Sequence, residues 1–183
     1  MRGKLWIAAL MLLASCTDGP PRVVEPRTDA APAPRGAALL RTTMLDGQNA
    51  ERATLGLPPL SWDPTLVTSA RAYALEMTRT GRFRHADQPP GPNHEGENLW
   101  TGTTRAYTYQ EMLGHWLDER RVFVNGITPA FSTTGDYRDA SHYAQIVWRN
   151  SQRMGCAMAG NAEDEYLVCR YSPTGNVVGE RVY

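Results

Sequence analysis

The chain has 183 residues and almost no lysine: Lys4 is the only one, and every later basic residue except histidine is arginine. Lysine plus arginine total 19 and aspartate plus glutamate total 19, so the formal net charge is zero. No basic excess is present to neutralise phosphates, and we therefore predict no nucleic-acid partner. The length suits one folded domain of roughly 150 residues with its own core.

Long hydrophobic runs are also lacking. The apolar run from Leu5 to Ala14 is too short to span a bilayer as a mature helix, and it follows Arg2 and Lys4, as in an export signal. Its end, Leu-Ala-Ser-Cys at Cys16, resembles the lipobox of bacterial lipoproteins, in which the cysteine becomes the lipid-modified first residue. We predict that residues 1–16 are a lipoprotein-type signal peptide with lipidation at Cys16, and the alternative is a plain secretory signal. Either form is exported, as an envelope lipoprotein attached to the membrane by its lipid anchor or as a secreted protein.

The next segment, residues 17–35, contains five prolines and few large apolar side chains. Such a composition cannot form a packed element, so we predict an extended tether. The folded domain is then expected over residues 36–183.

Cysteine is scarce, with three in all. If lipid occupies Cys16, then Cys156 and Cys169 remain as an even pair in an oxidising compartment. Each lies in a short apolar run, and the turn-forming GNAEDE between the runs predicts an antiparallel hairpin. We expect a Cys156–Cys169 disulfide, which would remove both thiols as nucleophiles.

Three helices are predicted, followed by strands. The apolar spacing over residues 35–55 is helical, Asp63-Pro64 can begin a second helix that ends at Gly81, and Thr108-x-x-Glu111 is a capping-box pattern that begins a third. Strands are expected around Ile146, Ala157 and Val168. Helices first and strands last indicate an α+β layered domain, and the polar segment over residues 122–141 is expected to be a surface loop beside a site.

The histidines are candidates for chemistry, and there are four of them: His85, His94, His115 and His142. Glu97 stands in a glycine-bearing loop before a strand-like Leu-Trp, so its carboxylate can be held beside buried surface, where it needs hydrogen-bond or imidazolium partners. Glu119 comes three residues after the apolar Trp116 and can reach inward at the helix end.

Four ordered motifs resemble one family: GENLW from Gly96, W-x-x-E from Trp116, HYAQIVWRNSQRMGCA from His142 and YLVCRYSPTGNVVGE from Tyr166. Together they are similar to the CAP superfamily, the SCP domain of cysteine-rich secretory proteins, antigen 5 and group 1 plant pathogenesis-related proteins. The likeness covers about residues 40–183. It implies a three-layer α-β-α sandwich with a central antiparallel sheet.

The resemblance also implies a cavity with two histidines and two glutamates, which map to His85, Glu97, Glu119 and His142. His94 is the alternative to His85, because the insertion before Glu97 is long. For His115 we expect a local ion pair with Glu119 on the helix surface. The family's histidine in its first helix is replaced by Gln48, outside these four positions.

Two imidazoles and two carboxylates can hold Zn²⁺ weakly through His85 and His142, with the glutamates orienting them. The alternatives are a structural hydrogen-bond network and true catalysis. We therefore predict an exported binding module whose cleft, lined by the four residues, Trp100 and residues 122–141, takes a lipid, sterol-like or peptide ligand. A metal-dependent hydrolase acting on peptide or envelope polymer is the second hypothesis, and a serine triad through Ser141 is weaker still.

Overall fold

The computed structural model describes residue 25 and residues 31–183. The predicted signal peptide, Cys16 and most of the predicted tether lie outside these residues, so they stay predictions. Across the described part of the chain, no helix is both long enough and apolar enough to cross a membrane.

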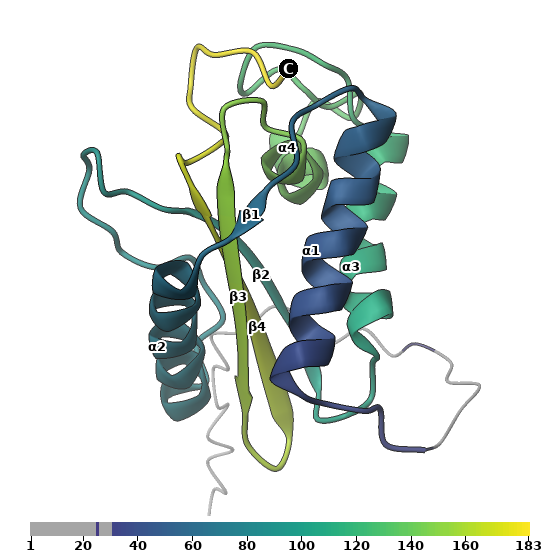
Figure 1. The fold of residues 1–183 in the computed structure, drawn as a ribbon, viewed down its shortest axis with the longest axis vertical. Coiled ribbons are helices and arrows are strands. Elements are labelled where there is room, and N and C mark those ends of the chain that lie inside the picture. The colour runs from purple at the N-terminus through teal and green to yellow at the C-terminus, as the bar shows by residue number, and fades with distance from the viewer. Residues whose placement is uncertain (1–24, 26–30) are drawn as a thin grey trace, which may run out of the picture.

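The domain is a three-layer sandwich, as predicted (Figure 1). The helix α2 (Pro64–Thr80) covers one face of a four-stranded sheet, and α1 (Ala37–Thr54), α3 (Tyr109–Asp118) and α4 (Ser141–Ile146) cover the other. The strands are β1 (Ser61–Trp62), β2 (Gly96–Thr103), β3 (Arg153–Gly160) and β4 (Asp164–Ser172), and their order across the sheet is β1-β3-β4-β2. The three long strands are antiparallel, whereas the short β1, which the sequence did not reveal, pairs in parallel with β3.

The β3–β4 hairpin confirms the predicted disulfide. Cys156 and Cys169 are directly opposite each other in the strand register and are bonded through sulfur. One face of the hairpin packs in the larger core against α1, α3 and α4, and the other packs against α2. At Gly155 a Cβ atom would lie 2.5 Å from the backbone nitrogen of Val67, so the absence of a side chain lets α2 approach the sheet closely.

Helix α1 buries a stripe in which every member is one turn from the next: Leu40, Met44, Gln48 and Arg52. Two members of this stripe are polar, which an apolar periodicity does not predict. Gln48 accepts a hydrogen bond from the hydroxyl of Tyr171 in the core. The helix is therefore bound to the sheet by a buried hydrogen bond as well as by apolar contacts.

Helix α2 begins as its sequence predicts. The carboxylate of Asp63 accepts a hydrogen bond from the Thr65 N–H, Pro64 fills the first helical position, and Gly81 ends the helix with φ 68°. The same carboxylate lies 2.6 Å from Arg153 on β3. The backbone hydrogen bond from Thr65 is the main cause that lowers the pKa of Asp63, and the charge of Arg153 adds to it.

Replacing Asp63 with alanine is expected to cost about 1 kcal/mol of the free energy of unfolding at pH 7, as for other N-cap losses. A carboxyl whose pKa is lower in the folded state stabilises the fold above its unfolded pKa. That stabilisation is lost as the pH falls through the folded value. Urea denaturation from pH 7 to pH 2.5 should therefore show the gap between wild type and variant closing in acid, and a gap independent of pH would contradict this.

The predicted strand around Ile146 is wrong, because residues 141–146 form the helix α4. Two backbone N–H groups in its first turn, those of His142 and Tyr143, donate to the carboxylate of Glu119. Glu119 is 23 residues upstream, so no local signal shows the helix start. Ile146, Val147 and Trp148 are fully or almost fully buried, as the apolar run suggested.

The segment over residues 122–141 is only partly the surface loop expected. Phe131, with no exposed surface, and the buried Ala140 belong to the main core. A short 3₁₀ helix, Tyr137–Ala140, leads directly into α4. Part of this segment thus belongs to the core and covers one end of it, whereas the sequence predicted only a surface loop beside the site.

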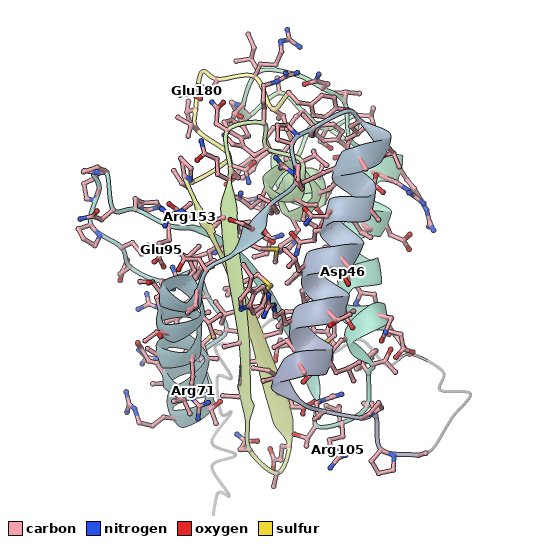
Figure 2. The ribbon with its side chains drawn as sticks, viewed as in Figure 1. Asp46, Arg71, Glu95, Arg105, Arg153 and Glu180 are labelled. Atoms are coloured by element: carbon pink, nitrogen blue, oxygen red, sulfur yellow. A yellow bond between two sulfur atoms is a disulfide. The ribbon has the colours of Figure 1, made fainter. Side chains whose placement is uncertain are left out.

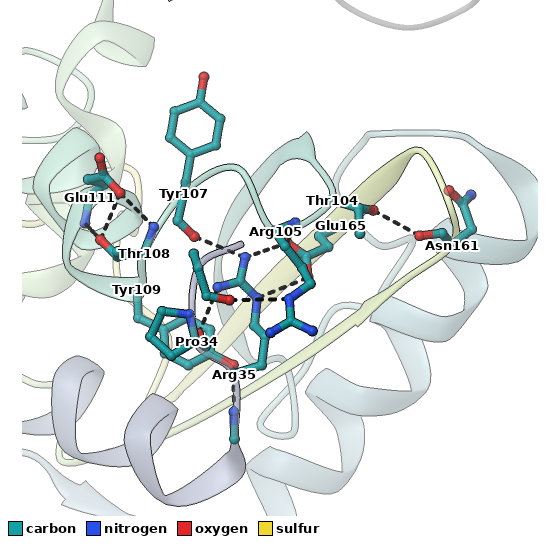
Figure 3. Close-up of polar contacts among 12 residues, drawn as sticks. Pro34, Arg35, Thr104, Arg105, Tyr107, Thr108, Tyr109, Glu111, Asn161 and Glu165 are labelled. Carbon is teal, nitrogen blue, oxygen red and sulfur yellow. Dashed lines mark hydrogen bonds and ion pairs between the residues drawn. The ribbon is translucent and has the colours of Figure 1, made fainter. Parts of the chain in front are cut away.

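The last residues of the predicted tether pack against the domain (Figure 3). Ala33 is buried and its N–H donates to the carbonyl of Arg105. Arg35 donates through Nε and Nη2 to the two carboxylate oxygens of Glu165, at 2.9 and 2.5 Å, and the Arg105 N–H donates to the same carboxylate. Contacts with the domain therefore begin before Gly36, and Arg35 fixes this segment to the sheet through Glu165.

Replacing Arg35 with alanine should lower the free energy of unfolding by about 2 kcal/mol, because the Glu165 carboxylate, 9% exposed, loses its cation. Proteolysis should then start at the released segment before Gly36. Arg82 is exposed, and its replacement by alanine is the control. Equal stability and equal cleavage rates in both variants would refute the role given to Arg35.

Candidate functional site

The first histidine–glutamate pair joins the segment after α2 to the start of β2. The Nδ1 atom of His85 lies 2.6 Å from Oε1 of Glu97, which also accepts a hydrogen bond from the Ala86 N–H at 3.1 Å. The His85 side chain is 67% exposed, whereas that of Glu97 is 5% exposed. A buried carboxylate thus holds an imidazole at the surface by one ring nitrogen.

Glu97 also pairs with a buried arginine. Arg170 faces it across the β2–β4 ladder, with Nη2 2.8 Å from Oε2 of Glu97, and its guanidinium lies over the Tyr73 ring at 5.3 Å. The Tyr73 hydroxyl donates to the carbonyl of Arg84, next to His85. Burial and the neighbouring carboxylate of Glu97 raise the pKa of Tyr73, so this donor stays protonated.

The second pair joins the end of α3 to the start of α4. Nδ1 of His142 lies 2.5 Å from Oε1 of Glu119, while Oε2 accepts the two N–H groups at the start of α4. The His142 ring stacks on Trp116 with 5.8 Å between centroids and 17° between planes. One carboxylate therefore caps a helix and orients a ring.

The two pairs are connected at the beginning of β2, an edge strand of the sheet. Glu97 faces α2, and the next residue, Asn98, faces the opposite side and donates to the carbonyl of His142 at 3.0 Å. At Gly96 a Cβ atom would lie 2.3 Å from Oε1 of Gln145, an oxygen that accepts a hydrogen bond from the Gly175 N–H. The GENLW motif and the motif that begins at His142 are thus in direct contact.

The remaining sequence candidates lie elsewhere. His94 is exposed, and its ring Nδ1 lies 3.4 Å from the carbonyl of Pro89. The expected His115–Glu119 pair is wrong: Nδ1 of His115 accepts from the indole N–H of Trp100, and Glu119 is used by His142. Ser141 donates to the carbonyl of Arg138, and within the described residues it forms no hydrogen bond with a histidine.

Trp100 does not line an open cleft. It is 7% exposed, its ring contacts that of Tyr107 at 5.1 Å, and it belongs to the main core. The sequence placed it beside the site because it follows Glu97 closely. The strand instead carries it into the interior, three residues along and on the opposite face.

The donor chemistry fits a divalent metal in part. In both pairs a carboxylate holds Nδ1 and leaves Nε2 as the nitrogen available to a metal, which is the carboxylate–histidine arrangement of many zinc sites. Within the described residues, no three side chains of histidine, cysteine, aspartate or glutamate are grouped so as to hold an ion. His85 and His142 are therefore the two candidate protein ligands, and water would complete the coordination.

Several residues important to this region were missed by sequence reasoning. Arg170 and Arg52 are buried arginines, and Glu51 accepts a hydrogen bond from the hydroxyl of Tyr143 at 2.7 Å, beside the second pair. Burial and this carboxylate raise the pKa of Tyr143. Glu97, Tyr143 and the carbonyls of Ile146, Trp148 and Ser151, with which these residues interact, lie far away in the sequence. No local pattern could have indicated these contacts, although an arginine between two buried strand positions was a signal for Arg170.

A sandwich of this order with two histidine–glutamate pairs defines the class of CAP-type domains. The family model described as "CAP: Cysteine-rich secretory protein family" matches residues 45–171, and the chain belongs to this family. It is 34% identical over 140 residues to the pathogenesis-related protein PR-1 type of Sambucus nigra, covering 76% of this chain and 79% of that protein. It is 33% identical to pathogenesis-related protein 1A of Nicotiana tabacum, with 76% and 78% covered.

Solved structures share the fold. The crystal structure of NaASP2 with Zn²⁺ superposes with a TM-score of 0.66 at 20% identity, covering 82% of this chain and 89% of that one. BmVAL-1 gives a TM-score of 0.65 at 22% identity, with 83% and 85% covered. At these identities the comparison shows the architecture and does not assign residue roles.

Proposed function

We propose that this chain is an exported CAP-domain binding protein, held at the envelope by a lipid at Cys16, that binds a divalent metal weakly through His85 and His142. The observation that carries the proposal is that both imidazoles are held at Nδ1 by a carboxylate, with Nε2 left for a metal. NaASP2 has the same fold and was crystallised with Zn²⁺. The secreted protein RBT4 of Candida albicans, 30% identical over 139 residues, is consistent with export.

The metal region is proposed to present a lipid, sterol-like or peptide ligand site. Both oxygens of Glu119 and Oε1 of Glu97 contact an imidazole or accept backbone hydrogen bonds, and Oε2 of Glu97 lies 2.8 Å from the guanidinium of Arg170. Neither is thus set up as a free general base, which favours binding over the hydrolase hypothesis. Ligand binding that persists in Glu97→Gln would agree with this assignment, whereas a saturable hydrolysis abolished by Glu97→Gln in a folded protein would overturn it.

A calorimetric titration with Zn²⁺ at pH 7.5 tests the metal part. The wild type is expected to bind one ion, and His85→Ala and His142→Ala should each weaken binding at least about tenfold, since each removes one of two protein ligands. His94→Ala is the matched control and should bind as the wild type does. If the wild type binds no ion, or if His94 is the residue required, the assignment fails.

A further inference from the structure

The segment that carries His85, residues 81–95, contains no helix or strand, and most of its side chains are exposed. It is attached to the domain at a few places. Tyr73 donates to the carbonyl of Arg84 at 2.6 Å, and the Ala86 N–H donates to Glu97. At its other end Gln88 makes two hydrogen bonds with the backbone of Glu95. A metal ligand on such a segment is well placed only if these attachments hold.

The attachments converge on the guanidinium of Arg170, which is 4% exposed. It lies 2.8 Å from Glu97, the partner of His85, and its Nε lies 3.7 Å from Oε2 of Glu95, where the segment ends. It also covers the ring of Tyr73, which holds Arg84. Figure 2 shows Glu95 near the end of the sheet opposite Arg105, so this cluster is separate from the Arg35–Glu165 contact.

Glu95 has a second support, because the Ser69 hydroxyl of α2 donates to its Oε2 at 2.6 Å. The carboxylate thus joins α2, β4 and the segment. Arginine suits this position because the planar guanidinium can present N–H groups to two carboxylates at once. The ammonium of a lysine is a compact point charge without this fixed arrangement of donors.

We propose that Arg170 is the positioning residue that fixes residues 81–95 to the sheet through Glu95 and Glu97, and so sets the place of the His85 imidazole. The consequence for metal affinity rests on the proposed function. The consequence for the segment does not, because it concerns contacts within the protein. The competing interpretation is that Arg170 only neutralises the buried Glu97 and stabilises the domain as a whole.

Hydrogen exchange measured by mass spectrometry on the exported protein separates the two interpretations. Arg170→Lys keeps the charge but removes the fork, and Glu95→Gln leaves the Arg170–Glu97 pair in place at a partly exposed position that tolerates the change. Both are expected to speed exchange in residues 82–95 about tenfold while α1 and the β3–β4 hairpin stay protected, since local opening is independent of global unfolding. The double variant should be no faster than the faster single variant, because both changes break one connection.

Arg153→Lys is the matched control, since Arg153 is a strand arginine paired with Asp63 and not with this cluster. It should leave exchange in residues 82–95 unchanged. In parallel, Zn²⁺ titration of Arg170→Lys should show about tenfold weaker binding, the low end of the effect of losing a partner that orients a ligand.

The outcomes are distinct. Unchanged exchange in residues 82–95 for Arg170→Lys and Glu95→Gln, additive effects in the double variant, or faster exchange throughout the domain would each overturn the positioning role. Selective release of residues 82–95 supports it. If that release occurs in a protein whose wild type binds no Zn²⁺, the positioning role stands and the proposed metal function fails.

Discussion

Arg52→Ala is expected to lower the free energy of unfolding by about 5 kcal/mol, enough to unfold much of a domain of ordinary stability. The Arg52 side chain has no exposed surface. It donates to four carbonyls: those of Pro58, Ile146, Trp148 and Ser151. Without Arg52 these carbonyls lose their donor, and each buried carbonyl left without a hydrogen bond costs about 1–3 kcal/mol of stability. The missing side chain also leaves a cavity, which lowers the stability further.

The guanidinium of Arg52 stays protonated although it is buried. Desolvation lowers the pKa of Arg52 to about 10, so at pH 7 the guanidinium still carries its proton and all its donors. The ammonium of Arg52→Lys cannot span the same four carbonyls, and an intermediate loss of about 2 kcal/mol is expected from the lost hydrogen bonds.

Urea denaturation followed by circular dichroism measures these effects. Arg41→Ala is the control in the same helix, where the side chain is exposed and lies over the ring of Trp62, and it should cost less than about 1 kcal/mol. If Arg52→Ala lowers the free energy of unfolding by less than about 1 kcal/mol, the four carbonyls have found other donors. Arg52 would then not be needed to fix the carbonyl of Ile146, the last residue of α4.

Glu119→Gln is expected to weaken Zn²⁺ binding by about 10–100-fold with the fold retained, the range for losing a carboxylate that orients a ligand histidine. The amide keeps an oxygen that can accept the N–H groups of His142 and Tyr143, but the carboxylate on Nδ1 of His142 is gone. Glu119→Ala removes the helix cap as well, and should cost about 2 kcal/mol of stability in addition.

Calorimetry and thermal denaturation of the two variants together separate the orienting role from the capping role. Asp118→Asn is the neighbouring control, because Asp118 is exposed and pairs only with Arg121 in the contacts of the described chain. Zn²⁺ binding by Glu119→Gln as tight as that of the wild type would mean that Glu119 caps α4 without orienting His142.

The ends of helices α2 and α3 could be predicted from the sequence because their signals are local. Asp63, Thr108 and Gly81 bound their helices through contacts within a few residues, and the structure confirms them. The disulfide was predictable for a similar reason, since a short turn joins its strands. The fold class and the family followed from motifs in the right order.

What the sequence concealed depends on long-range contacts. The start of α4 is capped by Glu119 from another helix, so its apolar run was mistaken for a strand. His115 was assigned to Glu119 by helical spacing, whereas the fold supplies Trp100 as its partner. Arg170 meets Glu97 only because the register of β2 and β4 places them opposite each other.

We propose that one metal ion binds the Nε2 atoms of both His85 and His142. Crystals of the protein grown with Zn²⁺, measured at two wavelengths on either side of the zinc absorption edge, test it most directly. We expect one anomalous peak at about 2.0–2.1 Å from Nε2 of both histidines, with Nδ1 of each still hydrogen-bonded to Glu97 or Glu119. A peak at His94 or His115, or none near the two pairs at saturating Zn²⁺, would contradict it and leave the four residues as a structural network.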